Sequence, residues 1–139
     1  MNHQLERRFA AKRKSRPRQW GNWEPVRYEV RCRRQRADLQ ADLEYFVAAA
    51  PATPDVQRIV VFGSYARGEI NPWSDLDLLV VRERGGTLSE RLDDLDALPS
   101  RVRRYIIVVT PTELHDRLPR TGLGETILRE GRVVYERPA

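Results

Sequence analysis

The chain has 139 residues, of which 40% are hydrophobic and 32% are charged, and its formal net charge is +5. This length predicts one domain with its own hydrophobic core, and no apolar run approaches the length of a membrane span or of a signal peptide. The single cysteine, Cys32, excludes an intramolecular disulfide and a thiolate metal cluster, so we expect a cytoplasmic protein without membrane contact.

The positive charge is concentrated in the N-terminal quarter of the chain. Residues 1–36 hold twelve Lys and Arg but only three Glu, a net charge of +9, whereas residues 37–139 carry −4. Residues 1–22 show no sustained periodicity, and we expect a flexible basic arm there. Such a segment can bind nucleic acid by counterion release, or it can act only as a solubilising tail, and both interpretations stay open.

A long helix is expected next, over residues 23–50. Its apolar side chains recur at steps of three, four or seven residues and form one stripe: Tyr28, Cys32, Leu39, Leu43, Phe46, Val47 and Ala50. Pro51 and Pro54 end this helix. The sequence therefore predicts a folded domain over residues 23–139, in which the helix precedes a core at 55–139.

The most informative segment is IVVFGSYARGEINPWSDLDLLVV, residues 59–81, which predicts a strand, a glycine turn, a short helix, a loop and a second strand. Because strand side chains alternate between faces, Asp75 and Asp77 project from the same face. Two such carboxylates repel unless a proton or cation lies between them, and their oxygens suit Mg²⁺ or Mn²⁺ that also binds phosphates. Gly63 permits close approach of the backbone to a ligand, and Ser64 opens a helix whose amides favour an anion. The segment predicts a site for a triphosphate with its metal ion.

The rest of the chain alternates helices and strands. Two capping boxes, Thr87 with Glu90 and Thr110 with Glu113, predict the starts of two helices. The expected strands are 58–62, 75–81, 103–109 and 132–136, and a last helix is expected at 125–130. This pattern predicts an α/β fold, with a small mixed sheet of about four strands and flanking helices.

The central segment also carries a family resemblance. Gly63-Ser64, ten further residues and Asp75-x-Asp77, with Ala-Arg-Gly after the serine, resemble the signature of the polymerase-β-type nucleotidyltransferases, above all their minimal nucleotidyltransferase branch. The likeness continues to an ending of the form ILREGRVVYE and covers roughly residues 37–139. It implies a polymerase-β-like nucleotidyltransferase fold and transfer of NMP from a nucleoside triphosphate, ATP above all, to an acceptor hydroxyl.

The resemblance assigns roles to residues of this segment. It implies that Asp75 and Asp77 are the catalytic pair and bind the Mg²⁺ or Mn²⁺ ion that bridges the nucleotide phosphates. It implies that Ser64 holds the β- and γ-phosphates and that Gly63 supplies clearance. Both belong to the expected nucleotide-binding site.

Three neighbouring residues have less definite roles. Ser74 is expected in the nucleotide site, where it would orient an aspartate. Arg67 is expected either to contact phosphate or to pair with Glu69, and Trp73 either to stack on a base or to pack. These alternatives stay open.

One position departs from the family pattern. The family usually places a third aspartate on the following strand, three residues before a Thr-Pro pair, where it completes the metal site at the attacking hydroxyl. Ile107 stands there in this chain, and its same-face neighbours Tyr105 and Val109 are not carboxylates. The sequence therefore predicts a weak enzyme, a degenerate nucleotide-binding scaffold, or a site that a partner's carboxylate completes.

The resemblance also suggests partners. Small single-domain members often act as antitoxins to helical HEPN ribonucleases, some of them by transferring AMP to a tyrosine of the toxin. A scaffold of the same fold would act instead by binding its partner, and a nucleic-acid-binding module would act through residues 1–36. A homo-oligomer stays open as well.

Overall fold

The computed structural model describes residues 16–139 and, from residue 26 onward, their side chains. The chain divides into two units between Arg34 and Gln35. The first unit contains the N-terminal part of helix α2 (Arg16–Ala49). In the part of the chain that the structure describes, the second unit holds every strand and the remaining helices.

The second unit is built on a mixed sheet of four strands in the order β3-β2-β1-β4. The strands are β1 (Val56–Phe62), β2 (Leu76–Arg82), β3 (Arg104–Val109) and β4 (Arg132–Glu136). β1 pairs antiparallel with β2 and with β4, whereas β2 pairs parallel with β3. The predicted α/β class and the small mixed sheet are therefore confirmed.

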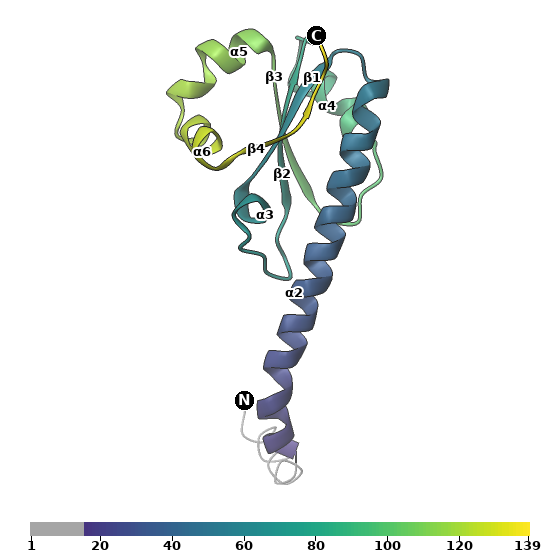
Figure 1. The fold of residues 1–139 in the computed structure, drawn as a ribbon, viewed down its shortest axis with the longest axis vertical. Helices are drawn as coiled ribbons and strands as arrows, with labels where there is room; N and C mark the ends of the chain where they lie inside the picture. The colour runs from purple at the N-terminus through teal and green to yellow at the C-terminus, as the bar shows by residue number, and fades with distance from the viewer. Residues whose placement is uncertain (1–15) are drawn as a thin grey trace. The chain divides into compact units, whose positions relative to one another are not determined.

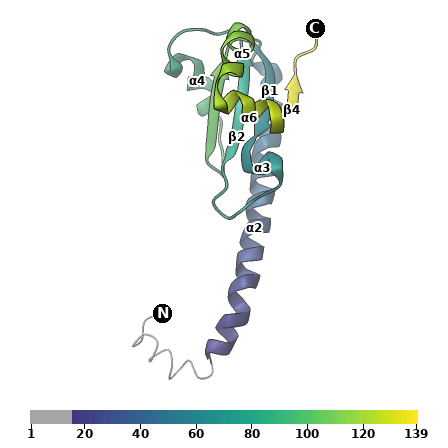
Figure 2. The same ribbon diagram turned by 90° about the vertical axis from the view of Figure 1, so that its left-hand side faces the viewer.

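Short helices join the strands and flank both faces of the sheet. They are α3 (Gly63–Arg67), α4 (Leu88–Asp96), α5 (Pro111–Asp116) and α6 (Gly122–Glu130). Figure 1 shows α5 and α6 on one side of the strands and α4 on the other, and Figure 2 looks onto the side that carries α5 and α6. Two layers of helix around one sheet allow both of its faces to be buried.

Each face of the sheet has its own apolar cluster. On one face, Leu39 and Phe46 from the C-terminal part of α2 pack against strand residues such as Leu78. On the other face, Leu118 and Ile127, which lie before and in α6, pack against the remaining strand residues. β2 is buried on both of its faces, as its continuous apolar run predicts.

A buried arginine fixes the far end of β2. The side chain of Arg82 is fully buried and donates paired hydrogen bonds of 2.9 Å to both carboxylate oxygens of Asp55 and of Asp94. These bonds lower the pKa of both aspartates. Arg82 therefore joins the start of β1, the end of β2 and helix α4.

A buried aspartate performs a similar task at the start of β3. Asp42 on α2 accepts hydrogen bonds from the Ser100 hydroxyl at 2.7 Å and from the amides of Arg101 and Val102 at 2.7 and 2.8 Å. A carboxylate that accepts three hydrogen bonds orders the loop that donates them. This loop leads directly into β3.

Both predicted capping boxes are present, one at the start of α4 and the other at the start of α5. The last helix begins at Gly122, three residues before its expected start. In the described part of the chain, no helix combines the length and the apolar character that crossing a bilayer requires.

The N-terminal helix is longer than the sequence predicts. It begins at Arg16 and not near residue 23, and Pro17 lies in its first turn, where the missing amide hydrogen has no helical partner. Of the arm expected over residues 1–22, residues 1–15 lie outside the described residues, and 16–22 are helical.

Candidate functional site

The glycine turn at the junction of β1 and α3 leaves space for a carboxylate. Gly63 directly follows Phe62, the last residue of β1, and has a φ of +78°, in the left-handed region that favours glycine. A Cβ atom on Gly63 would overlap an oxygen of the Asp77 carboxylate and lie 2.9 Å from its Cγ. Ser64 follows in the first turn of α3 and is half-buried. The turn therefore lies directly against Asp77.

Two carboxylates meet at the start of β2. Asp75 immediately precedes the strand, and Asp77 lies within it, paired with Phe62 of β1. Burial raises the pKa of Asp77 to about 6, the negative charge of Asp75 adds to this shift, and the nearby Arg67 opposes it. The two carboxylates therefore interact, and a cation between them would relieve their repulsion.

Arg67, at the end of α3, is held by two other carboxylates. Its guanidinium forms 2.8 Å ion pairs with Glu69 and with Glu130 of α6. These bonds raise the pKa of Arg67. Of the two roles expected for Arg67, the pairing with Glu69 is present, and phosphate contact stays a prediction. Glu130 joins the site from a distant helix, and nothing in its local sequence pointed to this contact.

Ser74 orders the loop that leads to the carboxylates. This serine is buried, its hydroxyl accepts a 2.9 Å hydrogen bond from the amide of Asn71, and its carbonyl accepts one of 2.7 Å from the Gln35 side chain. Ser74 thereby fixes the backbone just before Asp75, and its expected contact with an aspartate stays a prediction. Trp73 in the same loop is 69% exposed.

The parallel pairing of β2 with β3 decides which residue lies beside Asp77. Asp77 pairs with Tyr105, and Leu79 pairs with Ile107. Ile107 packs against the apolar cluster on that face of the sheet, whereas Tyr105 is 53% exposed. The family pattern placed the missing third carboxylate at Ile107, but Tyr105 is the β3 residue that neighbours the carboxylate pair.

Two carboxylates and a glycine cradle can accommodate one divalent ion. Among the residues described, no group of three His, Cys, Asp or Glu side chains could hold a metal. Mg²⁺ typically takes only one or two protein carboxylates and completes its shell with water and substrate phosphates. The pair Asp75 and Asp77 therefore fits a metal ion that arrives with a nucleotide.

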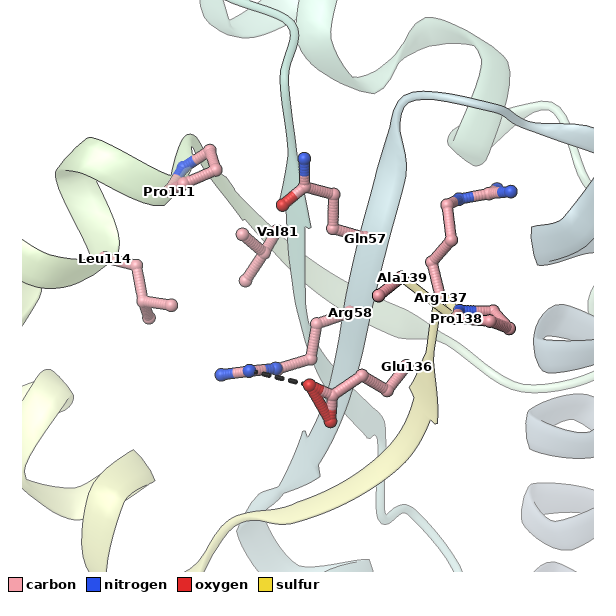
Figure 3. A pocket seen from close by; sticks show the side chains of 9 residues that line it. All are labelled: Gln57, Arg58, Val81, Pro111, Leu114, Glu136, Arg137, Pro138 and Ala139. Atoms are coloured by element: carbon pink, nitrogen blue, oxygen red, sulfur yellow. Dashed lines mark hydrogen bonds and ion pairs between the residues drawn. The ribbon is translucent and has the colours of Figure 1, made fainter.

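A separate hollow lies at the other end of the strands. It has a volume of about 360 Å³ and is lined in part by Val81 of β2 and Leu114 of α5 (Figure 3). Arg58 and Glu136, which also line it from adjacent strands, form a 2.8 Å ion pair. Neither aspartate of the carboxylate pair lines this hollow, so it is distinct from the candidate site.

Comparison with known proteins places this geometry in a family. Residues 44–133 match the family described as "Nucleotidyltransferase domain". "Putative protein adenylyltransferase MJ0141" of Methanocaldococcus jannaschii is 32% identical over 56 residues, which are 40% of this chain and 57% of that protein. This chain therefore spans less than two thirds of the length of that relative.

One solved structure has the same fold. The crystal structure of a "putative nucleotidyltransferase" from Sulfolobus solfataricus superposes with a TM-score of 0.54 at 22% identity, over 74% of this chain and 84% of that one. A toxin–antitoxin structure with AMP-PNP has a TM-score of 0.43 at 18% identity, over 64% of this chain and 68% of that one. The likeness to the Sulfolobus protein confirms the predicted fold.

Proposed function

Because this chain belongs to the nucleotidyltransferase domain family, we propose that it binds a nucleoside triphosphate with Mg²⁺ or Mn²⁺ and transfers NMP to an acceptor hydroxyl. The reaction joins the α-phosphate to the acceptor oxygen and releases pyrophosphate. The observation that carries this proposal is the Gly63 turn, which leaves room for Asp77 beside Asp75.

Asp75 and Asp77 are the residues that would hold the metal ion. When bound, such an ion neutralises the charge of the phosphates and orients them for displacement. Gly63 keeps the space above Asp77 clear, and Ser64 holds the β- and γ-phosphates from the start of α3. Since this transfer needs little covalent help from the protein, positioning and charge are the main contributions of these side chains.

Arg67 and Ser74 support the same site. The charge of Arg67 opposes the upward shift of the pKa of Asp77, and on nucleotide binding Arg67 exchanges at least one of its partners, Glu69 or Glu130, for a phosphate oxygen. Ser74 holds the loop before Asp75 in place through Asn71. Both residues thus act on the carboxylate pair from outside it.

ATP is the proposed nucleotide and a protein hydroxyl the proposed acceptor. Support comes from the Methanocaldococcus relative, whose name describes a protein adenylyltransferase. A HEPN-type toxin that this chain modifies as an antitoxin fits the same reaction.

A catalytically degenerate scaffold is the second candidate function. It is favoured by β3, where Tyr105 and Ile107 stand beside Asp77 and Leu79 and neither is a carboxylate. Such a protein would bind the Mg²⁺-nucleotide and its partner without transfer.

Calorimetric titration with ATP and Mg²⁺ tests the proposal. Wild type should bind, Asp77→Asn should not, and Asp96→Asn, which changes an exposed aspartate on α4, should bind like wild type. Equal binding of ATP with Mg²⁺ by wild type and Asp77→Asn would contradict the assignment of the metal site to Asp77. If wild type binds the nucleotide, an assay for pyrophosphate separates the two candidate functions, because an enzyme releases pyrophosphate and a scaffold does not.

A further inference from the structure

Tyr105 lies beside the carboxylate pair, on the same face of the sheet. β2 and β3 are parallel, so residues paired across them project to the same side, on strands about 4.8 Å apart. Asp77 pairs with Tyr105, and the next pair on this face, Leu79 with Ile107, packs within a single apolar cluster. The shared cluster shows that Leu79 and Ile107 point to the same face, and Asp77 and Tyr105, two residues earlier on each strand, therefore point to that face as well.

The Tyr105 side chain extends into solvent and not into the core. It is 53% exposed and lies on β3, an edge strand of the sheet. A tyrosine is longer than an aspartate, so its hydroxyl reaches beyond the neighbouring carboxylate. A phosphate bound over Asp75 and Asp77 would lie on the same face of the sheet as that hydroxyl, one strand away.

Other tyrosines of the second unit are placed differently. Tyr65 and Tyr135 pack against the apolar cluster of the opposite face. Tyr45, on α2, is 51% exposed, almost as much as Tyr105, but it lies near Asp42 and the loop at Ser100, not on β3. Tyr105 therefore combines exposure with a register position next to Asp77.

The geometry points to Tyr105 as an acceptor of the nucleotidyl group within the chain itself, an inference that rests on the proposed function. The Tyr105 hydroxyl oxygen attacks the α-phosphorus of the nucleoside triphosphate, and a new O–P bond forms. The bond from the α-phosphorus to the bridging oxygen breaks, pyrophosphate leaves, and the phenolic proton passes to solvent. The product is a phosphodiester that joins Tyr105 to NMP.

Mass spectrometry after incubation with ATP and Mg²⁺ tests this inference. Wild type and Tyr45→Phe should each gain the mass of one AMP group, and peptide mapping should place it on Tyr105. The gain should be lost in Tyr105→Phe, a conservative change at an exposed site, and in Asp77→Asn.

A second measurement tests whether Tyr105 lies beside the bound nucleotide, and it does not require the transfer reaction. Tetranitromethane should nitrate Tyr45 and Tyr105 at similar rates in the free protein, because their exposures are similar. Mg²⁺ with a non-hydrolysable ATP analogue should protect Tyr105 and leave Tyr45 reactive.

The outcomes separate the inference from the function on which it rests. Calorimetric binding of the Mg²⁺-nucleotide without an adduct on Tyr105, or an adduct that persists in Tyr105→Phe, overturns the acceptor role and leaves the proposed function standing. Absence of any nucleotide binding overturns both.

Discussion

At the scale of single residues, Gly63 combines two separate requirements. Its φ of +78° disfavours any side chain, and a Cβ there would overlap Asp77. Gly68 has almost the same φ, +79°, but a Cβ added there would meet nothing within 4 Å. Substitutions at Gly63 and Gly68 therefore separate the effect of backbone strain from the loss of the site.

Gly63→Ala and Gly68→Ala should each lower the free energy of unfolding by about 1–2 kcal/mol, because both force alanine into the left-handed region. Only Gly63→Ala should also abolish binding of ATP with Mg²⁺, because only there does the new methyl group displace a carboxylate. Chemical denaturation and calorimetric titration of both variants measure the two effects. If Gly68→Ala lost nucleotide binding equally, the Asp77 contact would not be the cause.

Two aspartates respond to pH in opposite directions. The pKa of Asp77 is raised from its ordinary 3.8 to about 6, so the native state holds this proton more tightly than the unfolded chain does. The free energy of unfolding therefore falls as pH rises through this window. Arg82 lowers the pKa of Asp94, so the stabilisation from Asp94 is present above its ordinary pKa and is lost as pH falls.

Without nucleotide, Asp77→Asn should gain stability relative to wild type between about pH 4 and pH 7, because it removes a carboxylate that the fold disfavours in its charged form. Asp94→Asn should be less stable than wild type at pH 7, with a difference that shrinks below about pH 4. Urea denaturation across this range compares the same chemical change at two sites. Parallel pH profiles for the two variants would contradict the assignment.

At the scale of elements, Arg82 is a buried polar link between strand β2 and helix α4. It is fully buried and bonds Asp55 and Asp94 through both oxygens of each, whereas Arg84 reaches the same two carboxylates at 3.2 and 3.6 Å and is 42% exposed. The two arginines thus pair with the same carboxylates but differ in burial.

Arg82→Lys should cost several kcal/mol of unfolding free energy, because one ammonium group cannot replace a planar fork that serves two carboxylates and the partners are left incompletely paired. Arg84→Lys should cost at most about 1 kcal/mol, as exposed ion pairs do. Urea denaturation at neutral pH measures both. Equal losses would show that burial of Arg82 does not set its contribution.

The elements also show which features the sequence could predict. A capping box such as Thr87 with Glu90 spans only three residues, so the local sequence predicts it, and the structure contains it. The spacing that brings Asp75 and Asp77 close together is equally local. The pairing of Asp77 with Tyr105 depends on the register between β2 and β3, which no local sequence pattern determines. The family pattern, which counts residues back from Thr110-Pro111, therefore directs attention to Ile107.

Contacts across the fold were beyond prediction for a similar reason. Glu130 meets Arg67 only because α6 crosses the sheet near α3, a separation of 63 residues along the chain. Arg82 likewise lies at the end of an apolar run, and nothing in the local sequence marks its two aspartate partners. Residue types and local spacing identified the carboxylate pair, whereas its surroundings depended on the tertiary structure.

At the scale of the whole molecule, charge and candidate chemistry are separated along the sequence. Residues 1–36 carry a net charge of +9, whereas the remaining chain, which contains both aspartates, carries −4. A nucleic acid would therefore be attracted to the N-terminal segment, and a nucleotide with its metal ion would bind at Asp75 and Asp77. Two triple substitutions that each remove three positive charges distinguish the arm from overall charge. The first replaces Arg7, Arg8 and Arg13 by Gln, and the second replaces the exposed residues Arg103, Arg120 and Arg129 by Gln.

If the arm binds nucleic acid, only the first triple variant should weaken binding of a single-stranded RNA oligonucleotide. It should also reduce the slope of log affinity against log salt by about 0.7 for each phosphate contact that is lost. Calorimetric binding of ATP with Mg²⁺ should be unchanged in both variants, because neither alters the carboxylate pair. Fluorescence anisotropy over a series of salt concentrations measures the slope. Equal weakening by the two variants would mean that overall charge attracts the RNA, and unchanged binding in the first would mean that the arm is a solubilising tail.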